Sequence, residues 1–328
     1  KGTVCKQCGR KEFKKETDII DVWFDSGVSH QAVLKRRKDL SYPCDLYLEG
    51  SDQHRGWFQS ALITSMAIDG ISAFKTVLTH GFVVDGEGRK MSKSIGNVVS
   101  PQDVIKDYGA DILRLWVASS DYRDDVRLGQ PILLNLVEGY RKIRNTLRYA
   151  LSNLFDFDPA KDSVKLLPLD VWVVARHDVL MAKVRAAYEA YEFHVVYHSV
   201  VDFCATDLSA LYFDIQKDPL YTSKKTGQRR RSAQTALFKI VRELLVALSP
   251  IMSFTSEEAW AHLPGAKTAS VFLADFPAPG VAPDAALMER YQKLFAVRAL
   301  VMPLLEAARK GKVIGKSEEA QVLLIATG

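Results

Sequence analysis

The sequence has little of what marks several protein classes. Its 328 residues include only 4 cysteines, too few for a disulfide framework, so a reducing compartment is the better expectation. No run of about 18 residues is free of charge, which argues against a membrane-spanning helix. The first residues hold neither an initiator methionine nor the apolar stretch of a secretion signal, so we expect a chain that begins inside a longer protein.

The excess of positive over negative charge is also small. The 44 Lys and Arg residues exceed the 39 Asp and Glu residues by 5, which permits a polyanionic partner without requiring one. Hydrophobic residues make up 48% and charged residues 25%, close to the globular average, so the composition excludes disorder and low-complexity repeats. At roughly 150 residues per domain, the length predicts about two domains.

The first part of the chain alternates short apolar runs with helical patterns. The expected elements are strands at 45–48, 76–79 and 82–84 and a helix over 57–66. Another helix should begin at Pro101, because Ser100 is a good cap and Asp103 puts an acid in the first turn. Strands that alternate with helices predict βαβ units and a parallel sheet.

Helical spacing dominates from residue 131 onward and predicts a helical bundle. The expected helices cover 136–154, 170–191, 195–211 and 232–248, with another from 254 and a long one after 284. A terminal strand is expected at 321–325, within a further small domain that the chain does not complete. The expected fold class is therefore α/β followed by all-α.

The most distinctive motif is the pentapeptide Lys90–Ser94, which lies between glycine-containing turns and is called the lysine loop below. Two lysines on a mobile loop can place compact positive charge against a polyphosphate, and flanking glycines allow such a loop to close. On its own, a pentapeptide of this kind is more often a solvated basic loop.

A second motif, LEGSDQHRGWF at 48–58, follows directly after a predicted strand. In open α/β sheets, ligands bind at the carboxyl ends of the strands. Gly50 would let the backbone approach a ligand, Asp52 can accept from ribose hydroxyls, and Trp57 can form the wall of an apolar pocket. The simpler alternative is a strand-to-helix turn with Asp52 as the helix cap.

In this order, the motifs resemble those of the class I aminoacyl-tRNA synthetases. The lysine loop is similar to the KMSKS loop of that family, and Gly50–Gln53 is similar to its GxDQ nucleotide motif. The longer strings 18–27, 48–58 and 79–101 resemble the isoleucine-specific group. The resemblance implies the second half of a Rossmann-type nucleotide fold followed by an anticodon-binding helical bundle.

The resemblance implies an ATP and adenylate site. Glu49 would hold the amino group of the aminoacyl-adenylate, while Gly50, Asp52 and Gln53 would contact its ribose and backbone. His80 would lie near the adenine.

The same resemblance implies an amino-acid pocket and catalytic lysines. Trp23 and Trp57 would enclose the isoleucine side chain, for which a rigid apolar wall is suitable. Lys90 and Lys93 would neutralise the triphosphate as pyrophosphate leaves, with Lys93 also contacting ATP. The implied reaction uses ATP and Mg²⁺ to join L-isoleucine to tRNA(Ile) through isoleucyl-adenylate, with positioning and charge stabilisation as the protein's main contributions.

Two parts of such an enzyme are missing from the 328 residues. No His-x-Gly-His string, the second signature of the family, is present, and there is no room for an editing domain. We therefore expect a fragment that alone neither activates isoleucine nor edits. Its expected parts are the end of a connective insertion (1–17), half of the catalytic domain (18–130), a connecting helix (131–168), the anticodon-binding bundle (169–283) and the start of a C-terminal domain (284–328).

Metal binding is a separate question. Cys5 and Cys8 form a C-x2-C pair, which is half of a four-ligand zinc site. The other half is not evident, because Cys44 and Cys204 are isolated in the sequence. The resemblance allows Zn²⁺ at this pair in the full-length protein.

The densest basic run of the predicted bundle is 224–231. Arg229, Arg230 and Arg231 are its candidate phosphate contacts for tRNA, and the alternative is a solubilising loop between helices. We expect a cytoplasmic monomer that does not bind membranes. Two other functions stay open: a valyl- or leucyl-type class I enzyme, and a non-catalytic tRNA-binding module derived from the family.

Overall fold

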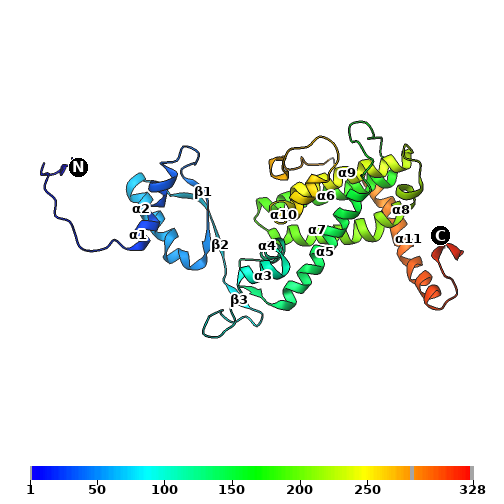
Figure 1. The fold of residues 1–328 in the computed structure, drawn as a ribbon, viewed down its shortest axis with the longest axis horizontal. Coiled ribbons are helices and arrows are strands. Elements are labelled where there is room, and N and C mark those ends of the chain that lie inside the picture. Colours follow the sequence, from blue (N-terminus) through cyan, green and yellow to red (C-terminus); the bar gives the residue numbers. More distant parts are fainter. Residues whose placement is uncertain (1, 281–283, 326–328) are drawn as a thin grey trace. The chain divides into compact units, whose positions relative to one another are not determined.

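The computed structural model describes residues 2–280 and 284–325 and divides into two compact units (Figure 1). Unit 1 comprises residues 1–84 and 122–127, and unit 2 comprises residues 85–121 and 128–328. The chain therefore passes from one unit to the other after residues 84, 121 and 127. The domain boundaries expected from the sequence stay a prediction.

Unit 1 is built on the predicted βαβ pattern. Strand β1 (Cys44–Gly50) pairs in parallel with strand β2 (Phe74–His80), and helix α2 (Trp57–Asp69) connects them. The register sets Gly50 opposite His80, so the carboxyl ends of the two strands meet at one edge. The expectation of a parallel sheet is confirmed.

The core of unit 1 lies between this sheet and helix α2. Tyr47 of β1 and Phe58 of α2 are buried together, and the Tyr47 ring stacks on Trp57 with centroids 4.3 Å apart. Burial of a large apolar side chain stabilises a fold by roughly 2 kcal/mol, so this cluster fixes the helix on the sheet. A short helix, α1 (Val22–Gly27), begins at Asp21, which accepts from the Trp23 amide at 2.7 Å.

Two short strands lie where the chain passes between the units. Strands β3 (Val83–Asp85) and β4 (Val126–Leu128) form a second two-stranded sheet. Helix α3 (Pro101–Tyr108) begins as predicted, with the Ser100 hydroxyl accepting from the Gln102 amide at 3.3 Å.

Unit 2 is mainly helical (Figure 1). Its helices after α3 are α4 (Ala110–Ser119), α5 (Gln130–Ser152), α6 (Pro168–Glu189), α7 (Phe193–Asp202), α8 (Phe213–Thr222), α9 (Gln228–Leu248), α10 (Ser253–Ala261) and α11 (Ala285–Lys310). Helices α5 and α9 contribute the buried aliphatic stripe of the bundle, including Ile143, Leu147, Leu237 and Leu244. The expectation of α/β followed by all-α is confirmed.

Helix α4 is anchored to the bundle by polar contacts. The buried Asp111 carboxylate accepts from the Thr255 amide at 2.7 Å and from the Thr255 hydroxyl at 2.6 Å, at the start of α10. Arg114 donates to the carbonyls of Pro250 and Ile251 at 2.6 and 2.9 Å. These contacts satisfy backbone groups that the helix end would leave without partners.

Two expectations need correction. The expected strand at 321–325 is wrong, since these residues make no ladder of backbone hydrogen bonds within the described chain. The expected helix over 195–211 is α-helical only to Asp202 and continues as a π-helix, Phe203–Tyr212. No helix in the described ranges combines the length and apolar character needed to cross a membrane.

Candidate functional site

The carboxyl ends of β1 and β2 bring together the first group of candidate residues. The Glu49 carboxylate accepts from the Gly50 amide at 3.0 Å, and the Nε2 atom of His80 lies 3.7 Å from the same oxygen. Both side chains are partly exposed. This edge therefore presents an acid and an imidazole to solvent, next to Gly50, which is itself buried.

The turn after β1 is a short 3₁₀ segment, Ser51–Arg55. Asp52 is exposed and is not the cap of helix α2, which corrects the simpler alternative for this motif. Gln53 performs that role instead, since its side-chain oxygen accepts from the Trp57 amide at 2.9 Å. Asp52 keeps an exposed carboxylate, with only the Gln53 amide as a weak partner at 3.3 Å.

Two residues near this turn form a contact that the sequence did not indicate. The Nε2 atom of His54 lies 3.2 Å from the Thr79 hydroxyl, so the turn is tied to the end of β2. The only signal for Thr79 was its place beside His80 in a predicted strand.

The two candidate tryptophans lie beside the same turn but in different surroundings. Trp57 packs in the core, and its indole nitrogen donates to the Ser26 carbonyl at 3.1 Å. Trp23 is 47% exposed, and its ring lies against Gly56. A Cβ atom on Gly56 would come within 2.9 Å of that ring, so the close approach requires glycine. Trp23 is thus the tryptophan with apolar surface available to a ligand.

The lysine loop belongs to unit 2. Lys90 and Lys93 are both exposed, and within the described residues no acidic side chain pairs with either ammonium group. Their charges are therefore available to an anion. The other candidate residues of the ATP and amino-acid sites belong to unit 1.

Cys5 and Cys8 lie in a tight turn. The Cys5 amide donates to the Arg10 carbonyl at 2.9 Å, and the Gly9 amide donates to the Cys5 carbonyl at 2.8 Å. Hydrogen bonds from the backbone of Cys8 and then Gln7 lower the pKa of the Cys5 thiol, which favours the thiolate that binds metals. In the part of the chain that is described, no three His, Cys, Asp or Glu side chains converge to hold a metal ion.

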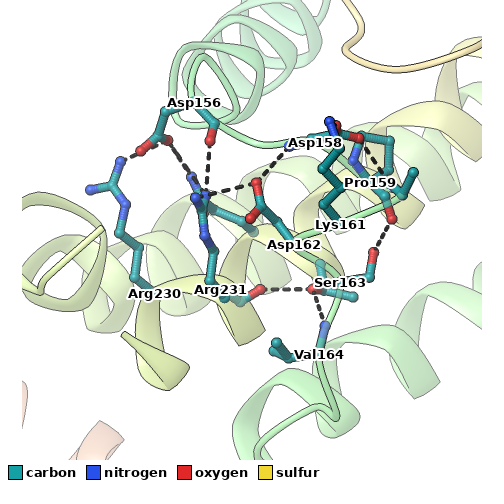
Figure 2. A network of polar contacts seen from close by, with 12 residues as sticks. Asp156, Asp158, Pro159, Lys161, Asp162, Ser163, Val164, Arg230 and Arg231 are labelled. Carbon is teal, nitrogen blue, oxygen red and sulfur yellow. Dashed lines mark hydrogen bonds and ion pairs between the residues drawn. The ribbon is translucent and has the colours of Figure 1, made fainter. Parts of the chain in front are cut away.

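The basic run is exposed only in part. Arg229 is exposed, but Arg230 and Arg231 are only 7% and 9% exposed. Figure 2 shows both of them directed at Asp156, with Arg231 also paired with Asp162 at 3.2 Å. Arg230 and Arg231 are therefore not available as phosphate contacts, because their charges are used inside the bundle.

The Asp156 carboxylate of this network is held in its charged form. Burial alone would raise the pKa of Asp156, but hydrogen bonds from Arg230 and Gln234 overcome it and the pKa is lowered. The network joins the start of α9 to the segment after α5, so it has a structural role.

A cavity of about 540 Å³ lies between helices α5 and α10. The side chains that line it include basic, acidic, amide and aromatic groups: Arg144, Asn145, Arg148, Phe155, Glu258 and His262. Phe155 is 74% exposed, whereas Arg144 is held by Glu258 through two contacts of 3.0 and 3.1 Å. A smaller cavity of about 310 Å³ shares Arg148 and includes Tyr221, which is 62% exposed.

These cavities were not found from the sequence. Their aromatic residues occupy helix ends whose exposure depends on the packing of the bundle.

Two family models match the chain. The family described as "tRNA synthetases class I (I, L, M and V)" matches residues 2–129. The family described as "Anticodon-binding domain of tRNA ligase" matches residues 170–324. Together they cover the α/β part and the helical bundle.

The chain is also similar to curated relatives. It is 55% identical to an isoleucine–tRNA ligase of Syntrophotalea carbinolica and 54% identical to one of Geobacter sulfurreducens, in each case over 99% of this chain. The chain spans 36% of the length of these relatives.

Solved structures share the fold. A LeuRS of Agrobacterium radiobacter K84, in a ternary complex with tRNA and LeuAMS, superposes with a TM-score of 0.64 over 87% of this chain and 35% of that one, at 19% identity. A methionyl-tRNA synthetase of Mycobacterium tuberculosis, in complex with methionyl-adenylate, gives 0.63 over 81% of this chain and 55% of that one, also at 19% identity. Motifs, family matches and fold agree, and the chain belongs to the class I aminoacyl-tRNA synthetases.

Proposed function

We propose that the protein carrying this chain attaches L-isoleucine to tRNA(Ile) through an isoleucyl-adenylate formed from ATP. The observation that carries the proposal is the 50–55% identity of nearly the whole chain to isoleucine–tRNA ligases. The geometry of the two candidate groups supports it: a polar edge at the ends of parallel strands, and a loop with two uncompensated lysines.

In the first step, a carboxylate oxygen of isoleucine attacks the α-phosphorus of Mg-ATP. The bond from that phosphorus to the bridging oxygen breaks, and pyrophosphate leaves with the electron pair. Lys90 and Lys93 stabilise the charge on the departing phosphates, and Glu49 holds the substrate ammonium. In the second step, a terminal adenosine hydroxyl of tRNA attacks the carbonyl carbon, and AMP leaves.

The remaining residues orient the adenylate. Gly50 and Asp52 would contact its ribose and backbone, and His80 would lie beside the adenine, since all three lie at the carboxyl edge of β1 and β2. The Gln53 side chain accepts from the Trp57 amide at the start of helix α2 and donates weakly to Asp52, so it would help to position the Asp52 carboxylate for the adenylate. Trp23 and Trp57 would enclose the isoleucine side chain, with Trp23 as the exposed part of that wall.

The helical bundle would bind the tRNA. Exposed aromatic rings next to Arg148 and Asn145 suit the stacking and hydrogen bonding of unpaired RNA bases. Arg229 is exposed and stays a candidate phosphate contact.

The proposal also includes zinc binding, a monomeric state and a cytoplasmic location. Cys5 and Cys8 would supply two of four ligands to Zn²⁺ in the full-length protein, supported by the tight turn that surrounds them. The protein would act as a monomer in the cytoplasm.

Amino-acid-dependent exchange of pyrophosphate into ATP tests the proposal. The full-length protein should support exchange with isoleucine at far lower concentrations than with valine or leucine. Exchange that prefers valine or leucine would assign the protein to one of those specificities instead. Binding of tRNA without any amino-acid-dependent exchange would favour the non-catalytic module.

A further inference from the structure

The lysine loop is closed at its base by two side chains, Asp85 and Asn97. The Asp85 side chain is only 10% exposed, and its carboxylate accepts four hydrogen bonds. Three of the donors belong to the turn itself: the Glu87 amide at 3.0 Å, the Arg89 amide at 2.8 Å and Nε of Arg89 at 2.9 Å. The fourth donor is Nδ2 of Asn97, at 2.9 Å.

Asn97 connects that carboxylate to the backbone of the loop. Its Nδ2 atom also donates to the Lys90 carbonyl at 3.2 Å, and its Oδ1 atom accepts from the Ser92 amide at 2.9 Å. Behind it, the Gly96 amide donates to the Ser92 carbonyl at 3.1 Å, in a left-handed conformation (φ +75°) that favours glycine. The Asn97 side chain therefore holds the backbone of the loop at two places, at Lys90 where the loop begins and at Ser92 in its middle.

One guanidinium group, that of Arg89, lies between two carboxylates at this contact. The Arg89 guanidinium lies 2.9 Å from Asp85 and 2.9 Å from Glu87. Hydrogen bonds from Asn97 and then from the Arg89 backbone hold the pKa of Asp85 well below its usual range. The carboxylate is thus ionised at neutral pH and keeps accepting from Asn97.

We propose that Asp85 and Asn97 are positioning residues, which hold the backbone of the lysine loop so that Lys90 and Lys93 face the phosphates of ATP. The inference rests on the proposed function for its catalytic consequence. Neither residue needs to touch substrate. A loop that is held in place before ATP binds loses less conformational freedom when the phosphates arrive, and its charges meet the transition state in a fixed position.

The substitution Asn97→Ala in the full-length protein tests the contact first. Hydrogen–deuterium exchange of the peptide spanning 89–98 should accelerate, because the Ser92 amide loses its acceptor. Isoleucine-dependent pyrophosphate exchange should fall about 10- to 100-fold in kcat, while KM for isoleucine stays unchanged. Gln102→Ala removes an exposed amide just beyond the loop and should change neither measurement.

The substitution Asn97→Asp should change the pH dependence of activity in a way that a general loss of folding would not. It places a second carboxylate at hydrogen-bond distance from Asp85, where two carboxylates cannot both stay ionised. One proton shared by the pair would restore the bond between them. The activity of this variant relative to wild type should therefore rise as the pH falls from 8 to 6.

Each outcome decides between the parts of the inference. Unchanged amide exchange in Asn97→Ala would show that Asn97 does not hold the loop, whatever the activity. Faster amide exchange with pyrophosphate exchange within twofold of wild type would overturn the positioning role, as would a flat pH ratio for Asn97→Asp. Absence of isoleucine-dependent exchange in the wild type would refute the proposed function, and the amide exchange would still decide whether the contact exists.

Discussion

Arg229 and Arg230 are neighbours at the start of helix α9 with different surroundings. Arg230 donates to the Leu220 carbonyl and, at 2.9 Å, to Asp156, whose contact with Arg230 is drawn in Figure 2. Arg229 is exposed. Removal of one partner from a buried ion pair leaves the other charge without compensation.

We expect Arg230→Ala to lower the free energy of unfolding of the bundle by about 3 kcal/mol, because Asp156 then stays buried with less positive charge beside it. Arg229→Ala should change it by less than about 0.5 kcal/mol. Urea denaturation of the full-length protein, followed by circular dichroism, measures both. Equal losses in the two variants would contradict the burial of Arg230.

Lys93 provides the residue-scale test of the catalytic proposal. Lys93→Ala should slow adenylate formation at least about 100-fold and leave isoleucine affinity nearly unchanged, since its ammonium stabilises charge on the phosphates. Lys106→Ala removes an exposed lysine from helix α3 and should have no effect. Pyrophosphate exchange and equilibrium binding of isoleucine measure the two quantities, and unaltered exchange in Lys93→Ala would refute the role of the loop.

At this scale, sequence reasoning found the residue types but not their surroundings. Lys90 and Lys93 were predicted as free charges, and both are exposed. Arg230 and Arg231 looked like members of one exposed run, because nothing local shows that Asp156, 74 residues before Arg230, will lie beside them. Burial of a charged side chain depends on a partner that only the folded chain supplies.

Helices α6 and α9 are joined by a buried polar pair. The His177 side chain is fully buried, and its Nε2 atom lies 3.0 Å from the Glu243 carboxylate, which also accepts from Lys239. Burial lowers the pKa of His177 because it disfavours the charged imidazolium, and Glu243 offsets this only in part.

This pair predicts a pH dependence of the bundle. The folded-state pKa of His177 lies below the unfolded value of about 6.5, so the unfolded chain binds the proton more readily. The contribution to stability is complete above that pH and is lost as the pH falls toward the folded pKa. The thermal midpoint should drop between pH 7.5 and 5.5, and His177→Gln should reduce the drop. His198→Gln, at an exposed position, should retain it.

Helix α5 carries the element-scale test of RNA binding. Arg148 lines both cavities of the bundle and is exposed. Arg148→Ala in the full-length protein should weaken tRNA binding and, if the guanidinium meets a phosphate, reduce the slope of log affinity against log salt by about 1. Lys142→Ala, on a different face of the helix, should leave that slope unchanged. The same slope in all three proteins would exclude a phosphate contact of Arg148.

Elements with strong local signals were predicted well. Ser100 and Pro101 predicted the start of helix α3, and the predicted strands 45–48 and 76–79 lie within β1 and β2. The run 321–325 has the same apolar character but makes no sheet, because a strand requires hydrogen-bonding partners on a neighbouring strand. Local pattern is sufficient for helices, whereas strands depend on pairing.

At the scale of the whole molecule, the isolated 328-residue chain should be inactive. It contains no His-x-Gly-His string, and in the described residues the sheet formed by β1 and β2 has two parallel strands, fewer than independent stability requires. Pyrophosphate exchange measured on this chain should stay at background, while the full-length protein should support exchange with isoleucine. Isoleucine-dependent exchange by the isolated chain would contradict this expectation.

The three passages of the chain between the units affect how the units can be exchanged between related genes. Residues 122–127 return to unit 1 after residues 85–121 have entered unit 2. A single recombination between two related genes therefore cannot exchange either unit intact. A graft of unit 2 into a relative would need residues 85–121 and 128–328 as two separate pieces, with six foreign residues between them.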